Sequence, residues 1–290
     1  MRRIYVCTIG VCMLLLAGSS CKKAYDFIRE HPDDHLSFCR ITHIRGDGFF
    51  AYPGATDTLT FFYNAKGDPT DMLDRSPARN SQDQHWRYDN RGRLIAYYIT
   101  FPPPPGYPPP TGAVEYHKYA YPKPDWVVDT VIYYGTPEFP PLYKDAFDGR
   151  IDAHLLDSRG RIIRTYHLAD LNPPTQPTTE YKYDANGNLE VSNYLGAPYP
   201  PGTTYDHMIN PYRTNYVFQF TYKDFSLNNL IAIDPASVGG LVPEYNQFGL
   251  PVTLPVPSLT IFTLITFDAM NSNPIEIDYA CSMPKGPIDY

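Results

Sequence analysis

Three short groups of polar residues carry side chains that could bind a metal ion. In the first, His31 and His35 enclose two aspartates, which combines imidazole and carboxylate ligands. The other two are rich in oxygen ligands: Asp184, Asn186 and Asn188, and Asp145, Asp148 and Asp152 around Gly149. Neither oxygen-rich group has the bidentate glutamate that completes a calcium loop, and the histidine group lies in a polar segment typical of a solvated linker. We therefore predict no metal site and no cofactor.

Sequence signatures of enzymes are also absent. The chain has no His-Glu-x-x-His motif, no Gly-x-Ser-x-Gly motif, no phosphate-binding loop and no dinucleotide-binding glycine pattern. Two carboxylates from distant strands could still meet in the fold, as they do in glycoside hydrolases, but the sequence singles out no such pair. We predict a protein that is not an enzyme and has no catalytic residues, with a glycan-active hydrolase as a lesser alternative.

The N-terminus has the parts of a bacterial export signal. Arg2 and Arg3 supply positive charge, and Ile4–Ala17 form an apolar run of fourteen residues, too short for a confident transmembrane helix. Small residues then lead to Cys21. This ending resembles the lipobox of bacterial lipoproteins, although Gly18 stands where that family has Leu, Val or Ile. The resemblance implies acylation of Cys21 and membrane attachment through lipid; ordinary cleavage at the two preceding serines is the alternative.

The cysteine count agrees with export. Cys7 and Cys12 leave with the leader, so Cys21, Cys39 and Cys281 remain. An odd number of cysteines in an exported protein calls for an explanation. If Cys21 carries lipid, the other two can pair in an oxidising compartment. We predict a disulfide between Cys39 and Cys281, with two buried free thiols as the alternative.

The composition favours β structure with stiff loops. Aromatic residues make up 15% of the 290 residues, and 31 residues are proline, about twice the usual share. Tyr, Phe, Thr and Val fit a pleated surface, whereas proline interrupts helices. An apolar content of 43% excludes a disordered chain. Removal of Arg2 and Arg3 changes the formal net charge from −7 to −9, which argues against nucleic acid as a partner.

A short phrase recurs along the mature chain and predicts β-hairpins. The copies are Tyr63-Asn64-Ala-Lys-Gly67, Tyr88-Asp89-Asn-Arg-Gly92, Leu156-Asp157-Ser-Arg-Gly160, Tyr183-Asp184-Ala-Asn-Gly187 and Tyr245-Asn246-Gln-Phe-Gly249, with a looser one at Phe267-Asp268-Ala-Met-Asn271. The Asp or Asn side chain accepts a backbone hydrogen bond that holds a type I turn. The glycine then takes the left-handed conformation of a G1 bulge. We expect about eight hairpins.

Residues beside these turns alternate between apolar and polar, as half-buried antiparallel strands do. Leu59, Phe61 and Tyr63 share one face, and aromatic residues at every second position predict a strand over 216–222. The prolines gather between the hairpins, at 102–110, 137–141, 173–177, 198–201 and 251–257. Successive connections of a meander alternate between the two ends of its sheet. We therefore expect tight turns at one end and proline-rich loops at the other.

The Tyr-Asp-x-x-Gly-x-Leu phrase resembles the YD repeats of Rhs-type proteins. With a lipobox followed by Lys22-Lys23, the chain is similar to uncharacterised envelope lipoproteins of the Bacteroidota, and the resemblance covers most of residues 39–281. It implies a lipid-anchored protein of the cell envelope, at the outer membrane, and it carries over no catalytic residues. The chain divides into a signal peptide (1–20), a lipid-attached tether (21–38), one hairpin domain (39–281) and a tail (282–290).

We predict an all-β fold, an antiparallel meander with a short N-terminal tether. A Cys39–Cys281 bridge would place the first and last strands together, which favours a closed or nearly closed barrel or roll. Such a barrel gives one functional alternative, a carrier of a small apolar ligand.

Aromatic residues on the proline-rich loops form a candidate binding surface. They are Tyr107, Phe139, Tyr143, Tyr199 and Tyr205. Aromatic rings on stiff loops suit sugar rings or peptide segments, because little entropy is lost when they bind; packing of the rings on the prolines is the alternative. We predict a non-enzymatic binding or structural lipoprotein that uses this surface.

Overall fold

In the part of the chain that the computed structural model describes, five turns of one geometry connect strands, and all five arise from the repeated phrase. At one of them, the Asp89 side chain accepts hydrogen bonds from the backbone N–H groups of Arg91 and Arg93, both at 2.9 Å. Gly92 follows with a left-handed φ of 83°, which L side chains avoid. The strand register shifts beside each turn, as a G1 bulge requires. The predicted turn chemistry is confirmed at Gly67, Gly92, Gly160, Gly187 and Gly249.

The structure describes residues 36–47, 56–75, 83–100, 115–133, 149–168, 177–192, 204–222, 225–232, 242–254 and 274–282. The strands there are β1 (Cys39–Asp47), β2 (Thr56–Tyr63), β3 (Pro69–Asp74), β4 (Asp83–Tyr88), β5 (Leu94–Thr100), β6 (Glu115–Lys123), β7 (Trp126–Tyr133), β8 (Gly149–Leu156), β9 (Ile162–His167), β10 (Thr179–Tyr183), β11 (Leu189–Ser192), β12 (Thr204–Ile209), β13 (Asn228–Ala232), β14 (Glu244–Tyr245), β15 (Pro251–Leu254) and β16 (Ile275–Cys281). The helical elements are η3 (Pro211–Thr214) and α2 (Phe218–Tyr222). Within these ranges, no helix has the length and apolar character needed to cross a membrane.

Fourteen of the strands form one antiparallel sheet, in the order β11-β10-β9-β8-β7-β6-β5-β4-β3-β2-β1-β16-β15-β14. The first eleven strands follow the order of the chain, as the predicted meander does. The last three strands pair on the other side of β1, while β12 and β13 form a separate pair. The all-β class and the antiparallel meander are therefore confirmed.

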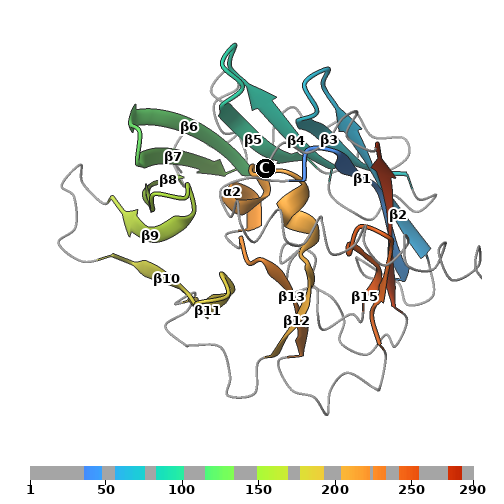
Figure 1. Cartoon of the computed structure of the whole chain (residues 1–290). Coiled ribbons are helices and arrows are strands. Elements are labelled where there is room, and N and C mark those ends of the chain that lie inside the picture. Colours follow the sequence, from blue (N-terminus) through green and yellow to red (C-terminus); the bar gives the residue numbers. More distant parts are fainter. Residues whose placement is uncertain are drawn as a thin grey trace, which may run out of the picture.

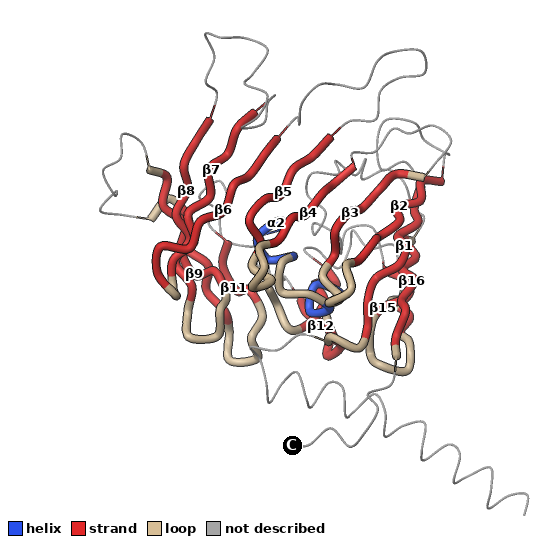
Figure 2. The backbone as a smooth tube through the Cα atoms, turned by 90° about the horizontal axis from the view of Figure 1, so that it is seen from above, coloured by secondary structure: helices blue, strands red, loops and turns tan. Residues whose placement is uncertain are grey.

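The two ends of the sheet differ, as predicted. The five Asx-Gly turns lie at one end, which we call the turn end (Figure 2). The chain leaves β5, β7, β9 and β11 at the opposite end, which we call the loop end, and four of the five predicted proline-rich connections begin there. The fifth, 251–257, instead begins in β15, where Pro251 lies beside the turn at Gly249.

The sheet curves around a central segment that we call the plug, residues 204–222 and 225–232 (Figure 1). Aromatic rings of the plug fill the concave side near the turn end. Phe218 contacts Phe61 of β2 and Trp86 of β4, with ring centroids 6.2 and 6.1 Å apart. Phe220 contacts Tyr119 of β6 at 5.6 Å. The main hydrophobic core therefore lies between the sheet and the plug.

The predicted strand over 216–222 is wrong, because this segment ends in α2. The four successive residues Val217, Phe218, Gln219 and Phe220 are all buried, and four successive residues point to all sides of a helix. Strands surround the segment on several sides, so it needs no single apolar face. Alternating aromatic residues therefore do not distinguish a strand from a short central helix here.

The plug also donates hydrogen bonds to the carbonyl groups of the turn glycines. The four contacts are Tyr216 Oη to Gly92 O (2.7 Å), Gln219 Nε2 to Gly160 O (3.0 Å), Leu227 N to Gly187 O (3.2 Å) and Ile209 N to Gly249 O (3.0 Å). Burial raises the pKa of Tyr216 to about 12, so its hydroxyl stays protonated and can donate at neutral pH. Hairpins far apart in the sequence are thus fastened to one central segment.

Tyrosine hydroxyls join neighbouring hairpins at the turn end. Tyr88, the residue before one Asx turn, donates to the carbonyl of Pro69, two residues beyond the glycine of the preceding turn (2.8 Å). Tyr121 donates to Leu94 in the equivalent way, also at 2.8 Å. The same relation holds for Tyr205 with Leu189 and for Tyr279 with Pro251. Tyr88 of the repeated phrase is therefore a contact between hairpins as well as part of a strand face, and three tyrosines outside the phrase reach the same position of a turn.

Cys39 and Cys281 form the predicted disulfide. They are direct partners in the register of β1 and β16, with Cα atoms 4.1 Å apart. However, β1 and β16 lie in the interior of the strand order, and the sheet ends at β11 and β14. The bridge therefore joins the first and last strands without joining the edges of the sheet, so closure does not follow from it.

Removal of the bridge should destabilise the protein substantially. The disulfide closes a loop with a sequence separation of 242 residues, and the loop-entropy model assigns about 5 kcal/mol to a loop of that size. A Cys39→Ser/Cys281→Ser variant should therefore unfold at much lower urea concentration than the oxidised wild type. Reduced wild type is the control and should match the variant. Labelling of both cysteines in denatured, unreduced protein would contradict the bridge.

Candidate functional site

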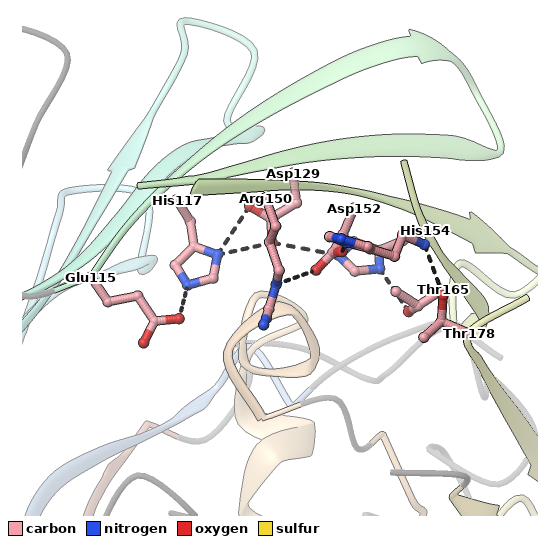
Figure 3. Close-up of polar contacts among 9 residues, drawn as sticks. Glu115, His117, Asp129, Arg150, Asp152, His154, Thr165 and Thr178 are labelled. Carbon is pink, nitrogen blue, oxygen red and sulfur yellow. Dashed lines mark hydrogen bonds and ion pairs between the residues drawn. The ribbon is translucent and has the colours of Figure 1, made fainter. Parts of the chain in front are cut away.

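Polar side chains form a row on the concave face of β6 to β9, where the alternation of the strands would otherwise place apolar residues. In β7, for example, Asp129 occupies an inward position between the buried residues Val127 and Val131. We call this set the polar row: Glu115, His117, Asp129, Arg150, Asp152, His154, Thr165 and His167. Figure 3 labels all of these residues except His167. Four adjacent strands thus present charged or hydrogen-bonding groups to one interior surface.

A continuous chain of contacts crosses these strands. His117 Nε2 lies 2.9 Å from Glu115 Oε1, and its Nδ1 lies 2.9 Å from Asp129 Oδ2. His154 Nε2 lies 3.5 Å from the same aspartate oxygen, and its Nδ1 lies 2.9 Å from Thr165 Oγ1. Asp129 is 1% exposed, and a carboxylate so deeply buried is costly unless it is paired. The two imidazoles provide that pairing.

Asp152 forms a second branch of the row, directly opposite Asp129 in the register of β7 and β8. Its Oδ2 accepts a hydrogen bond from Arg150 Nε at 2.9 Å, and its Oδ1 lies 3.1 Å from His167 Nδ1. Burial lowers the pKa of Arg150, but the neighbouring acidic groups, Asp152 foremost, outweigh this and raise it. Arg150 is therefore a fixed positive charge.

Exposure increases along the row toward the loop end. The side chains of His117 and His154 are 9% and 1% exposed, whereas those of Arg150 and His167 are each 45% exposed. Glu115, Arg150 and His167 lie at or next to the strand ends where the connections to the loop end begin. The row therefore runs from a buried interior to a surface beside the proline-rich connections.

One hydroxyl beside the row is buried without a partner. Tyr119 packs parallel to His117, with ring centroids 6.0 Å apart, and it is the register partner of Asp129. Its Oη has no hydrogen-bond partner in the described part of the chain. Burial, and then the charge of Asp129, raise the pKa of Tyr119 well above its usual value. The hydroxyl is thus neutral and keeps its proton.

The convex face carries a smaller polar group. His85 Nδ1 lies 2.7 Å from Asp71 Oδ1, and its Nε2 lies 3.1 Å from Thr100 Oγ1. This order of carboxylate, imidazole and hydroxyl could activate a nucleophile. The His85 ring is, however, stacked on Tyr98 at 4.6 Å on the open side of the sheet. We regard this group as a cross-strand contact that joins β3, β4 and β5.

Most of the predicted site residues lie outside the described residues, namely Cys21, Tyr107, Phe139, Tyr143 and Tyr199. Tyr205 is described and is half-buried in β12, and its hydroxyl donates to Leu189 O at 2.6 Å. In this position it holds the plug to β11.

The positions considered for metal binding have other contacts or are not described. Asp184 accepts backbone hydrogen bonds from Asn186 and Asn188, both at 2.8 Å, as a turn residue. Asp152 belongs to the polar row. His31, His35, Asp145 and Asp148 lie outside the described residues. Among the residues that the structure does describe, no group of three or more His, Cys, Asp or Glu side chains is arranged to hold a metal ion.

Sequence reasoning missed the polar row. A signal was present at Asp129, which falls on the inward parity of a strand whose neighbouring inward residues, Val127 and Val131, are apolar. The side chains that contact one another in the row come from different strands, so these contacts could not be predicted without the register of the strands. Comparison with models of known protein families, and with curated proteins, finds no match for this chain.

Glu115 should make part of the stability dependent on pH. Burial alone would raise its pKa, but the hydrogen bond and charge of His117 outweigh burial and lower it. A depressed carboxyl pKa stabilises the fold above the unfolded value, about 4.3, and this contribution is lost as pH falls through the folded pKa. Glu115→Gln should therefore cost about 1 kcal/mol at pH 7 and less at pH 3, measured by urea unfolding.

The exposed carboxylate Glu276, whose side chain is 62% exposed, provides the control for this measurement. Glu276→Gln should change the stability little at either pH. An equal loss for Glu115→Gln at pH 7 and pH 3 would show that the charge of Glu115 does not stabilise the fold.

Proposed function

We propose that the protein is an exported, lipid-anchored binding protein of the cell envelope, and that it binds a glycan at the loop end of its concave face without catalysing a reaction. The observation that carries this proposal is the polar row, which becomes exposed toward the loop end. Four of the aromatic residues predicted as a binding surface, Tyr107, Phe139, Tyr143 and Tyr199, belong to connections that begin at the same end. The row and these residues would then act on one ligand.

The chemistry of the row favours a hydroxyl-rich ligand. Carboxylate, imidazole, guanidinium and hydroxyl groups alternate along it, so it offers both donors and acceptors over a short distance. A sugar presents donors and acceptors in the same way, and its ring faces suit aromatic side chains. A peptide ligand is a second outcome of the binding test, and hydrolysis of a bound glycan is a third.

Export and anchoring rest on the N-terminal sequence. The positive leader, the apolar run and the resemblance to a lipobox at Cys21 support attachment to the outer membrane through lipid. The Cys39–Cys281 disulfide agrees with an oxidising compartment outside the cytoplasm.

We further propose that the curved sheet closes into a barrel-like body through the plug. Both edges of the sheet contact it: Leu189 of β11 accepts the hydroxyl hydrogen bond of Tyr205, and Tyr245 of β14 donates to Asp206. Aromatic residues of the plug occupy the concave side near the turn end. This packing disfavours the alternative of a carrier with an apolar ligand in that part of the interior.

Lipidation at Cys21 can be tested in a bacterial host with lipoprotein processing. Cells expressing the full chain should incorporate an alkynyl fatty acid into the wild type, and Cys21→Ser should abolish the label. The paired cysteines Cys39 and Cys281 should keep their disulfide in that variant, which serves as the control for export and folding. Equal labelling of both proteins would contradict anchoring at Cys21.

Ligand binding can be tested with a form of the mature chain that lacks the lipid-bearing Cys21, residues 22–290, on glycan and peptide arrays, followed by titration calorimetry of each ligand found. We expect binding of oligosaccharides, and His117→Ala should weaken it at least tenfold, because the loss of His117 breaks the row between Glu115 and Asp129. His85→Ala on the convex face is the matched control and should bind normally. Absence of glycan binding would refute the proposal, and product formation during the titration would replace it with a hydrolase.

A further inference from the structure

The outermost part of the polar row has a built-in positioning group. Both oxygens of Asp152 are engaged, one by Arg150 Nε at 2.9 Å and the other by His167 Nδ1 at 3.1 Å. The Asp152 side chain is only 10% exposed, so it supports these two groups from below the surface. A carboxylate that binds two long side chains in this way fixes the direction in which both of them point.

The contacts to Asp152 leave the outer nitrogens of both side chains available. Within the described part of the chain, Arg150 Nη1 and Nη2 and His167 Nε2 have no hydrogen-bond or ion-pair partner. The two side chains are each 45% exposed. Figure 3 shows the Arg150 guanidinium extending away from its strand, beyond the carboxylate that holds it.

The acidic groups of the row do not cancel this positive surface, because they are recessed. The side chains of Glu115, Asp129 and Asp152 are 19%, 1% and 10% exposed. Glu115 and Asp129 are both engaged by His117. A ligand that approaches from the loop end therefore meets the basic side chains first. A guanidinium that is held through Nε keeps its two terminal nitrogens in a planar fork, which suits a carboxylate or a sulfate.

We infer that Arg150, positioned by Asp152 and flanked by His167, is an anion-binding subsite, and that the ligand of this protein is an acidic glycan. The anionic group is a sugar carboxylate or a sulfate ester, which present similar oxygen atoms to a guanidinium. This inference rests on the proposed function, because it specifies the ligand class of the same surface.

The test compares acidic and neutral oligosaccharides on the protein without its lipid-bearing cysteine, residues 22–290. Calorimetry would use an oligogalacturonide, a sulfated galactan oligosaccharide and the neutral galactan oligosaccharide. We expect wild type to bind at least one acidic ligand at least tenfold more tightly than the neutral one. The two acidic ligands separate recognition of a carboxylate from recognition of a sulfate.

Arg150→Gln should remove most of the preference for acidic ligands, because the affinity for acidic ligands should fall by a larger factor than the affinity for neutral ligands. Arg150→Lys keeps the charge but not the fork and should lose part of the preference. Asp152→Asn should also reduce the preference for acidic ligands, because Arg150 is then less well held.

Arg164→Gln is the matched control. Arg164 lies in β9 on the convex face, pairs with Glu180 and is similarly exposed at 48%, so its loss should have no effect on binding.

The outcomes separate the two proposals. Equal binding of neutral and acidic ligands by wild type, or an unchanged preference in Arg150→Gln, would overturn the anion subsite and leave glycan binding intact. Absence of binding by every oligosaccharide would overturn both. Unfolding midpoints of the variants close to that of wild type would show that a lost preference reflects the subsite and not misfolding.

Discussion

The hydrogen bonds between the plug and the turn glycines are the contacts on which the rest of the structure depends. A glycine in the left-handed conformation ends each Asx turn, and at four turns its carbonyl accepts a hydrogen bond from the plug. Of these four glycines Gly249 is buried, and a buried carbonyl without a partner would cost about 1–3 kcal/mol. Each contact requires the plug to lie within hydrogen-bond distance of a turn, and the sheet curves to bring turns that are far apart in the chain within that distance.

This constraint gives the two ends of the sheet different roles. The turn end is occupied by the plug, by the tyrosine contacts between hairpins and by the aromatic core around Trp86 and Phe218. The loop end carries no turn of this kind in the described residues, and there the concave face becomes polar instead of apolar. Because the plug holds the sheet together at the turn end, the loop end can carry side chains that do not stabilise the core. A rigid scaffold usually presents a binding site in this way.

The parts of this fold that could be predicted from sequence are those that local chemistry determines. Asp89 and Gly92 specify a turn because the side chain and the backbone conformation act within five residues. The pairing of Cys39 with Cys281 could be predicted because no other cysteine remains once two leave with the leader and Cys21 carries lipid. The helix at Phe218 could not be predicted, since its surroundings come from strands distant in sequence. The same reason hid the contact of His117 with Asp129, which depends on the register of two strands and not on any spacing along the chain.

The polar row is better explained by function than by stability. Buried ion pairs contribute little to stability, because the loss of solvation offsets the attraction between the charges, and apolar residues of similar size often serve the fold as well. The inward positions of β7 already hold valines on both sides of Asp129, so an apolar residue would continue the pattern.

A carboxylate there needs two histidines from neighbouring strands to compensate its burial. That requirement fixes the orientation of the inner groups, and Asp152 does the same for Arg150 nearer the surface. The row therefore combines little gain in stability with strict orientation of its outermost side chains, which is the combination expected of a site that recognises a ligand.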